Sequence, residues 1–242
     1  MARGAQGPFG SNPLIFLFFI LALANLSSLS QILDEAISSP VSFWSFIAAV
    51  VLGITTHEFM HAYTAHRLGD DTARSVGRLT LNPLAHFDLL GSFFLLLFRF
   101  GYGKPVPVNE SRLRGGRRGG TLVSLAGPLT NLVVATICAL PLRFADRASL
   151  DGSYVTLLAT AVVINTSLFV FNLLPIPPLD GSRVVYGLLP PREAYTWRSY
   201  EQYGPFILLG IFLILPLLRI DLLGPLVGGP TRFLVGILLG SR

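Results

Sequence analysis

Charged residues and cysteine are both scarce in this 242-residue sequence. Asp, Glu, Lys and Arg make up 13% of the residues, about half of what a soluble domain carries, while 52% are hydrophobic. This balance excludes an ordinary soluble globule and predicts an all-α integral membrane protein that crosses the bilayer several times. The only cysteine, Cys138, lies in an apolar run, which excludes an intrachain disulfide and a cysteine-based zinc finger.

The sequence also lacks a long hydrophilic stretch, a fixed-period repeat and, apart from the short run RGGRRGG, any low-complexity tract. We therefore expect residues 1–242 to form a single membrane-embedded domain. The formal charge of +5 could indicate nucleic-acid binding, but the cations gather in short loops beside apolar runs. In such loops they set the topology in the membrane, so we expect no nucleic-acid partner.

Apolar runs mark the expected membrane spans. A spanning helix needs about 20 predominantly apolar residues, and the sequence predicts about six spans. They cover residues 13–33, 41–66, 121–142, 154–174, 204–218 and 221–239. The run LLGSFFLLLFRF at 89–100 is too short to cross the bilayer, so we expect it to form a re-entrant or short strand-like segment near the functional site.

The first of these runs has a second interpretation. Arg3, the apolar residues 14–23 and the small residues Ala22 and Ala24 imitate a secretory signal with its cleavage site. The charge-free stretch nevertheless continues to Leu33, which gives it the length of a spanning helix. We therefore favour a retained first span.

Lysine and arginine in the short loops predict the orientation, because these residues are enriched on the cytosolic side. Between residues 99 and 118, the single acidic residue Glu110 stands against the basic residues Arg99, Lys104, Arg112, Arg114, Arg117 and Arg118. The connection 143–153 balances its basic and acidic residues. We therefore expect the first loop to be cytosolic and the second external, which also places the segment after His61 and the segment 175–203 on the cytosolic side.

The apolar run VSFWSFIAAVVLGIT is followed by the motif HEFMH at residues 57–61. On a helix, positions i and i+4 lie on one face about 5–6 Å apart, so His57 and His61 can direct a nitrogen at the same metal ion. Glu58 is rotated about 100° from His57, close enough to reach a metal-bound water without being a ligand. Charged groups inside a span cost at least about 2.5–3.5 kcal/mol each, so the motif indicates a zinc site rather than a chance match.

A catalytic zinc normally takes three protein ligands, so one more is expected outside this motif. His66 lies about 180° round the helix from His57 and points away from the pair. His86 and Asp88, in the run LNPLAHFDLLG, could return to the metal.

Asp180, in NLLPIPPLDG, is the strongest candidate for the third ligand. The prolines 175, 177 and 178 must break the helix before it, and unwound backbone at membrane depth is tolerated where it lines a cavity or packs in protein. An Asx-turn with Gly181 is the alternative role for this residue.

Two asparagines stand within apolar spans. Asn131 lies in the sequence AGPLTN, and Asn172 precedes Pro175 by one turn. Either side-chain amide could donate a hydrogen bond to a developing oxyanion or hold an extended peptide. Ordinary hydrogen bonding between helices, worth about 0.6–2 kcal/mol in membranes, explains each of them equally well.

The segments HEFMH, GRLTLNP, KPVPVN, LAGPLTN and NLLPIPPLDG occur in the order found in the site-2 proteases, the intramembrane zinc metalloproteases. Over about residues 43–190, the chain resembles a short prokaryotic member of this family. The resemblance implies that His57, His61 and Asp180 bind one Zn²⁺ ion and that Glu58 is the general base.

The resemblance extends to the two asparagines. The family pattern N-x-x-P-x-x-x-x-D-G matches Asn172 and the residues up to Gly181, and the pattern G-P-x-x-N matches Gly127 to Asn131. Both asparagines are thereby implied to act catalytically, through contacts to the transition state or the substrate.

The same resemblance implies an activity and a location. We expect a zinc endopeptidase that hydrolyses peptide bonds within or next to transmembrane segments of membrane proteins, for signalling or for clearance. It would reside in the prokaryotic cytoplasmic membrane, with the lipid bilayer around it and the active site toward the cytosol. Because the connection 143–153 is short and the chain stops soon after its last span, we expect neither a PDZ nor a CBS module.

Two other classes of function compete with this one. A metal transporter or metal-sensing membrane protein could use the same histidines, but transporters tend to show inverted repeats and paired broken helices, which the sequence does not display. A proteolytically inactive binding protein is disfavoured because Glu58 is retained beside both histidines.

The orientation predicts which loops a thiol reagent can reach. In a chain whose Cys138 has been replaced, Asn109→Cys should resist a membrane-impermeant reagent added to intact cells, because the 103–118 loop is expected in the cytosol. Ser149→Cys, in the connection 143–153, is the matched control and should react. Labelling of position 109 from outside would overturn the orientation.

Overall fold

The computed structural model describes residues 34–88, 103–145 and 150–240 and shows an almost entirely helical protein in these ranges. No strand occurs among the described residues, where extended pairing is limited to an isolated antiparallel bridge between Phe87 and Gly103. The expected first span at 13–33 lies outside the described residues, as does the expected re-entrant segment at 89–100. The remaining helices confirm an all-α polytopic membrane protein.

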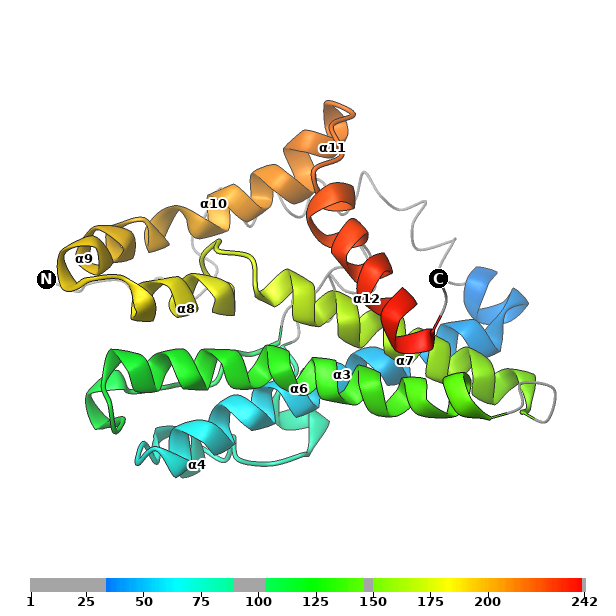
Figure 1. The fold of residues 1–242 in the computed structure, drawn as a ribbon, viewed down its shortest axis with the longest axis horizontal. Coiled ribbons are helices and arrows are strands. Elements are labelled where there is room, and N and C mark those ends of the chain that lie inside the picture. Colours follow the sequence, from blue (N-terminus) through cyan, green and yellow to red (C-terminus); the bar gives the residue numbers. More distant parts are fainter. Residues whose placement is uncertain (1–33, 89–102, 146–149, 241–242) are drawn as a thin grey trace, which may run out of the picture.

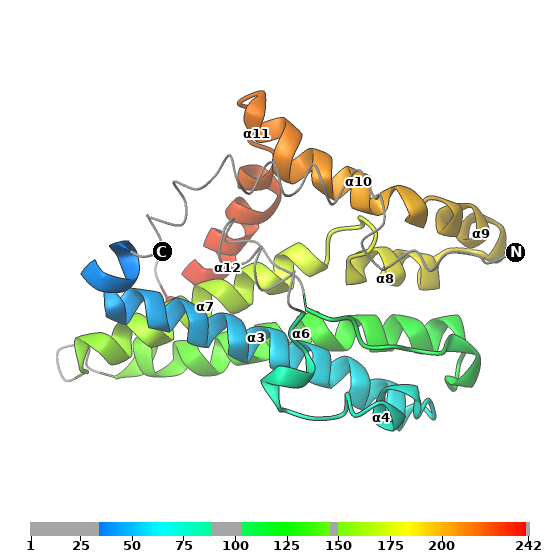
Figure 2. The ribbon, with the colours of Figure 1, turned by 180° about the vertical axis from the view of Figure 1, so that it is seen from behind.

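Three long helices form the centre of the structure (Figure 1 and Figure 2). They are α3 (Pro40–Arg67), α6 (Arg117–Phe144) and α7 (Gly152–Asn172), and each contacts the other two. Each is long and apolar enough to cross a membrane, which agrees with the runs 41–66, 121–142 and 154–174. The side chain of Asp151 caps α7 by accepting hydrogen bonds from two backbone amides of its first turn.

Small residues let these three helices approach one another closely. Ala49 on α3, Ala135 on α6 and Ala161 on α7 are almost completely buried. A methyl group added at Gly53 would lie 2.7 Å from the end of the Leu168 side chain, so the α3 backbone passes close to α7 and a side chain here would displace Leu168. Such contacts are typical of helices packed in lipid, where close van der Waals packing drives association.

Large apolar side chains point away from the helix bundle. On α6, the exposed ones are Leu122, Leu129, Val133, Ile137 and Leu140. This arrangement would be unfavourable in water, because contiguous exposed apolar surface of this kind is uncommon on soluble proteins. It fits a bundle whose outer face is solvated by hydrocarbon.

After α7, the chain runs through a proline-rich segment and turns back into α8 (Asp180–Leu188), which packs along α6. Helix α9 (Pro191–Ser199) and a 3₁₀ turn (Glu201–Tyr203) follow. Gly204 then packs against the backbone of Pro177, so the start of the next helix is tied to the segment that precedes α8.

The C-terminal helices rise away from α7 and return to it (Figure 1). The rising part comprises α10 (Gly204–Leu209), a π-helical turn (Gly210–Ile214) and α11 (Leu215–Leu217). A second π-helical turn (Gly224–Gly228) and α12 (Gly229–Leu239) lead back to α6 and α7.

The apolar runs 204–218 and 221–239 form helices of different lengths. The expected span 204–218 is the apolar part of a longer helical stretch, Pro191–Leu217, which is long enough to cross a membrane. The expected span 221–239 forms the shorter apolar helix Gly224–Leu239. Among the described residues, four helices therefore reach the length and composition of a span.

The segment between α3 and α6 is organised around a buried carboxylate. It includes α4 (Thr72–Ser75) and the 3₁₀ turns Pro83–Ala85 and Glu110–Arg112. Asp70 is fully buried and accepts hydrogen bonds from the backbone amide and hydroxyl of Thr72 and, at 2.6 Å, from the amide of Asn109. Burial raises the pKa of Asp70, but these hydrogen bonds and the charge of Arg112 outweigh it and lower the pKa below its usual value.

Asp70 should therefore make stability depend on pH. Its folded-state pKa lies below the unfolded value of about 3.9, so the stabilisation is complete above that pH and is lost as the pH falls through the folded-state pKa. We expect Asp70→Asn to lower the free energy of unfolding by about 1–3 kcal/mol at pH 7, because its amide cannot accept all of these bonds, and by much less near pH 2.

Thermal unfolding in detergent, at both pH values, measures this difference. Asp71→Asn is the matched control, because the Asp71 side chain is mostly exposed and its ion pairs with His66 and Arg74 lie at the surface. An equal loss of stability in the two variants at pH 7 would contradict the role of Asp70.

Candidate metal centre

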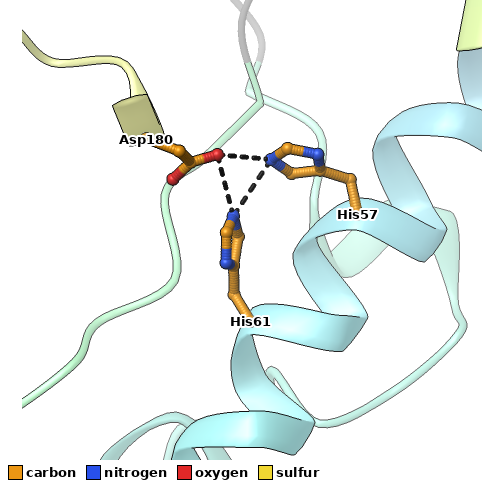
Figure 3. Close-up of side chains that lie close together, drawn as sticks. All are labelled: His57, His61 and Asp180. Carbon is orange, nitrogen blue, oxygen red and sulfur yellow. Dashed lines mark hydrogen bonds and ion pairs between the residues drawn. The ribbon is translucent and has the colours of Figure 1, made fainter. Parts of the chain in front are cut away.

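Three side chains from two distant parts of the chain meet at one point (Figure 3). His57 and His61 project from one face of α3, and Asp180 projects from the first turn of α8. The two Nε2 atoms lie 3.0 Å apart. The Oδ2 atom of Asp180 lies 3.0 Å from Nε2 of His57 and 3.2 Å from Nε2 of His61. The i, i+4 spacing of the histidines thus brings their Nε2 atoms together on one face of the helix, as expected.

The outer nitrogens of both imidazoles are held by acceptors from α6. His57 Nδ1 lies 2.7 Å from Oδ1 of Asn131, and His61 Nδ1 lies 2.7 Å from the carbonyl oxygen of Val123. Because oxygens of these kinds only accept hydrogen bonds, each Nδ1 must carry the proton. In their neutral form, both rings therefore present the lone pair of Nε2 to the centre of the group.

This donor set fits a zinc ion. Two nitrogen lone pairs and a carboxylate oxygen within 3.2 Å of one another repel unless a proton or a metal cation lies between them. Donors around a tetrahedral zinc, with bonds of about 2.0–2.2 Å, are about 3.3–3.6 Å apart, so the three atoms need to separate by only a few tenths of an ångström. Zinc-bound histidines usually donate a hydrogen bond from the ring nitrogen that does not bind the metal, as both imidazoles do here.

Gly127 on α6 leaves the room for this group. A methyl group added there would overlap His61 Nε2 and would lie 2.7 Å from His57 Nε2. The backbone of α6 therefore passes directly against the metal-binding edges of the imidazoles. No residue larger than glycine can occupy this position while the three donors stay together.

The chain around Asp180 is held from two sides. A methyl group added at Gly181 would overlap the carbonyl oxygens of Leu173 and Leu174, which shows that the first turn of α8 folds back on the end of α7. The indole Nε1 of Trp197 on α9 donates to Ser182, at 3.1 Å from both its carbonyl and its hydroxyl oxygen. These contacts fix the helix start from which the carboxylate projects.

Glu58 lies beside the three donors and not among them. It is partly buried on α3, and its Oε1 would be 3.6 Å from a methyl group added at Gly103. The carboxylate therefore lies next to Gly103, one of the two residues of the Phe87–Gly103 bridge.

The other candidate ligands lie elsewhere. His86 is fully buried and its Nε2 donates to the carbonyl oxygen of Thr80 at 2.8 Å, while His66 pairs with Asp71 at the surface. Within the described part of the chain, the group that could hold a metal consists of His57, His61 and Asp180, and Asp88 is not part of it.

The two asparagines predicted from the sequence occupy different surroundings. Asn131 is fully buried, and its amide donates to the carbonyl oxygen of Gly53 and to Oδ1 of Asn165, both at 3.0 Å. The Asn172 amide donates at 3.0 Å to the carbonyl oxygen of Leu168, one turn earlier in its own helix. The structure thus brings Asn131 to His57 and leaves Asn172 bonded within α7.

Sequence reasoning missed Asn165. It lies in the run VVINTSLF, two helical turns before Asn172, and an uncharged amide inside an apolar span was the only signal that could have drawn attention to it. It is fully buried.

Comparison with known proteins places the chain in a family. Residues 139–215 match the sequence profile of Peptidase family M50, a stretch that includes Asp180 but not the histidines. No solved structure matches the chain significantly.

Three bacterial relatives align over most of the chain. "Putative zinc metalloprotease YwhC" of Bacillus subtilis is 38% identical over 75% of this chain and 86% of its own length. "Putative zinc metalloprotease Rip2" of Mycolicibacterium smegmatis is 32% identical over 85% of this chain and 81% of its length. The protein of the same name from Mycobacterium tuberculosis is 36% identical over 71% of this chain and 67% of its length.

The helical architecture, the metal-binding group and these matches together define a membrane metallopeptidase. The chain belongs to Peptidase family M50, the site-2 proteases, and is a zinc metalloendopeptidase. The family resemblance seen in its sequence motifs is confirmed.

Substitution of Gly127 should disrupt the metal centre while the helix stays intact. Gly127→Ala places a methyl group against both Nε2 atoms, so we expect zinc affinity to fall at least about tenfold. Gly120→Ala, in the same helix, is the control, because its methyl group would lie 3.7 Å from Glu110, an ordinary contact. Zinc analysis of both purified variants measures the effect, and full zinc binding by Gly127→Ala would contradict this account of the site.

Proposed function

We propose that this zinc protease hydrolyses peptide bonds within or next to transmembrane segments of membrane proteins. The observation that carries the proposal is the depth of the metal-binding group. His57 lies ten residues before the end of the candidate span Pro40–Arg67, which places it about 15 Å from that end along the helix axis. Peptide bonds that reach the group must therefore enter the apolar bundle.

The proposed mechanism assigns the metal to His57, His61 and Asp180 and the proton transfers to Glu58. When bound, zinc polarises the scissile carbonyl and lowers the pKa of a water molecule to about 7. Glu58 accepts a proton from the attacking water and later delivers it to the departing amine. Its place directly after His57 on α3, outside the three donor residues, supports this role.

The substrate must lose helical structure before it can react. A transmembrane helix hides its carbonyl groups in internal hydrogen bonds, and no water is present in the lipid core to replace them. We therefore propose that cleavage occurs in segments that contain helix-breaking residues. These unwind at lower cost and expose the scissile carbonyl to the site.

The two asparagines have separate roles in this proposal. Asn131 holds His57, since its oxygen accepts from the imidazole and its amide is already bonded to Gly53 and Asn165. The Asn172 amide carries two N–H donors, and one of them bonds to Leu168. The other donor can contact the substrate or the transition state while that bond is kept.

We further propose that residues 1–242 act as a single domain in the cytoplasmic membrane of a prokaryote, with the active site toward the cytosol. The excess of arginine between residues 103 and 118 supports this orientation. The substrates are single-span or multi-span membrane proteins that reach the site through the bilayer.

Co-expression with candidate substrates tests the activity. Tagged single-span proteins from the same organism should be cleaved by the wild type and left intact by Glu58→Gln. The purified wild type in detergent should cut a bare transmembrane substrate. A strict requirement for a soluble partner, or cleavage confined to soluble segments far from the membrane, would sink the proposal.

Metal content should separate the ligand from the base. Asp180→Asn weakens the charge and donor strength of a ligand, so zinc content and hydrolysis should fall together. Glu58→Gln removes a proton acceptor and no metal bond, so zinc should stay near one ion per chain while hydrolysis drops by about 10²-fold or more.

Metal analysis and peptide hydrolysis, measured on both variants beside the wild type, decide between these roles. Full zinc retention in Asp180→Asn would remove Asp180 from the ligand set. Loss of zinc from a folded Glu58→Gln would mean that Glu58 is itself a ligand.

A further inference from the structure

Asn165 is an uncharged polar residue at the centre of the bundle. It lies in the second half of α7 and is completely buried, and its Oδ1 lies next to Asn131 on α6 and Gly53 on α3. Its Nδ2 donates to the carbonyl oxygen of Ala161, and its Oδ1 accepts from Nδ2 of Asn131, each at 3.0 Å. A buried amide costs free energy unless its groups are paired, and here both are paired.

These bonds fix the direction of a chain of hydrogen bonds. The Ala161 carbonyl only accepts, so the Asn165 amide nitrogen must face it and the Asn165 oxygen must face Asn131. The Asn131 nitrogen is held in the same way by Asn165 and by the Gly53 carbonyl. The Asn131 oxygen then has one remaining direction, toward His57.

The series of hydrogen bonds ends at His57, whose Nε2 is the nitrogen assigned to the metal. Because Asn131 can only accept from His57 in this orientation, the proton of the neutral imidazole stays on Nδ1. The lone pair of Nε2 therefore points toward His61 and Asp180. A flipped Asn131 would present an N–H group to His57 and would favour the opposite tautomer.

We propose that Asn165 is a positioning residue of the metal centre, which acts through Asn131 to hold His57 in its metal-binding tautomer and orientation. The proposal rests on the assignment of His57 as a zinc ligand. It gives α7 a direct part in the site, although none of the three donor atoms belongs to this helix.

The neighbouring residue supplies a matched control. Thr166 is also fully buried on α7, and its hydroxyl has no hydrogen-bond partner among the described residues. Truncation to alanine at either position removes a small buried polar side chain from the same helical turn. The loss of packing is therefore similar, whereas only Asn165 is connected to His57.

A second substitution isolates the bond to Asn131. A serine at position 165 can bond back to the Ala161 carbonyl, four residues earlier in the helix, but is too short to replace the amide oxygen that meets Asn131. Asn165→Ser therefore removes the link to the metal centre and keeps the link within α7. It also tests the proposal if Asn165→Ala does not fold.

The zinc dissociation constant, measured by competition with a chelator on the purified full chain, is the first readout. Asn165→Ala and Asn165→Ser should bind zinc about 10–100-fold more weakly than the wild type, the usual loss when the partner of a ligand is removed. Thr166→Ala should stay within about threefold of the wild type, because the hydroxyl it removes has no partner to leave unsatisfied.

A double-mutant cycle then tests the route through Asn131. If Asn165 acts through Asn131, Asn165→Ala added to Asn131→Ala should weaken zinc binding no further. The visible absorption spectrum of the Co²⁺-loaded protein should change in Asn165→Ser and match the wild type in Thr166→Ala, since it reports the arrangement of the ligands.

The outcomes distinguish this inference from the function on which it rests. Wild-type zinc binding that survives His57→Ala would overturn the assignment of His57 itself. Zinc binding that requires His57 but is equally tight in Asn165→Ser and the wild type would overturn the role of Asn165 alone. So would equal losses in Asn165→Ala and Thr166→Ala, or additive effects in the double-mutant cycle.

Discussion

The hydrogen bond between His57 and Asn131 joins the two helices on which the metal centre depends. It is 2.7 Å long, lies in the interior of the bundle and orients an imidazole that must present a lone pair and not a proton. The bond requires α3 and α6 to be in close contact, and Gly127 permits that approach. The second imidazole is oriented by a backbone carbonyl of the same helix. The site is thus a product of helix packing as much as of its ligands.

The asparagine and histidine side chains at the centre of this bundle are hydrogen-bonded to one another, while the outer face is apolar. In water, a core gains stability by removing apolar surface from solvent, but in lipid that gain is absent and internal hydrogen bonds and close packing replace it. The link Asn165–Asn131–His57 joins three helices, and in the role proposed for Asn165 it also positions a candidate zinc ligand. The same interaction can therefore contribute to folding and to chemistry.

Local sequence patterns predicted those parts of the site that depend on residues close together in the chain. The spacing of His57 and His61 fixed their common face, and the prolines before Asp180 indicated a broken helix that could bring a carboxylate into the bundle. Apolar runs located the three central helices. The contacts of Asn131, the need for glycine at position 127 and the part played by Asn165 depend on how helices meet, which no local pattern encodes. The helix from Gly224 to Leu239 was expected to be longer because apolar composition does not reveal where a turn interrupts a helix.

The metal-binding group is divided between elements far apart in the chain, since 119 residues separate His61 from Asp180. Both histidines belong to α3, whereas the carboxylate follows only after α6 and α7 have been made. An ion held by all three would close a loop that contains two spanning helices, and the entropic cost of closing a loop grows with its length. During biosynthesis, a chain that has not yet reached residue 180 holds an incomplete ligand set. A chain that needs all three donors therefore acquires proteolytic competence only after α3, α6 and α7 have been synthesised.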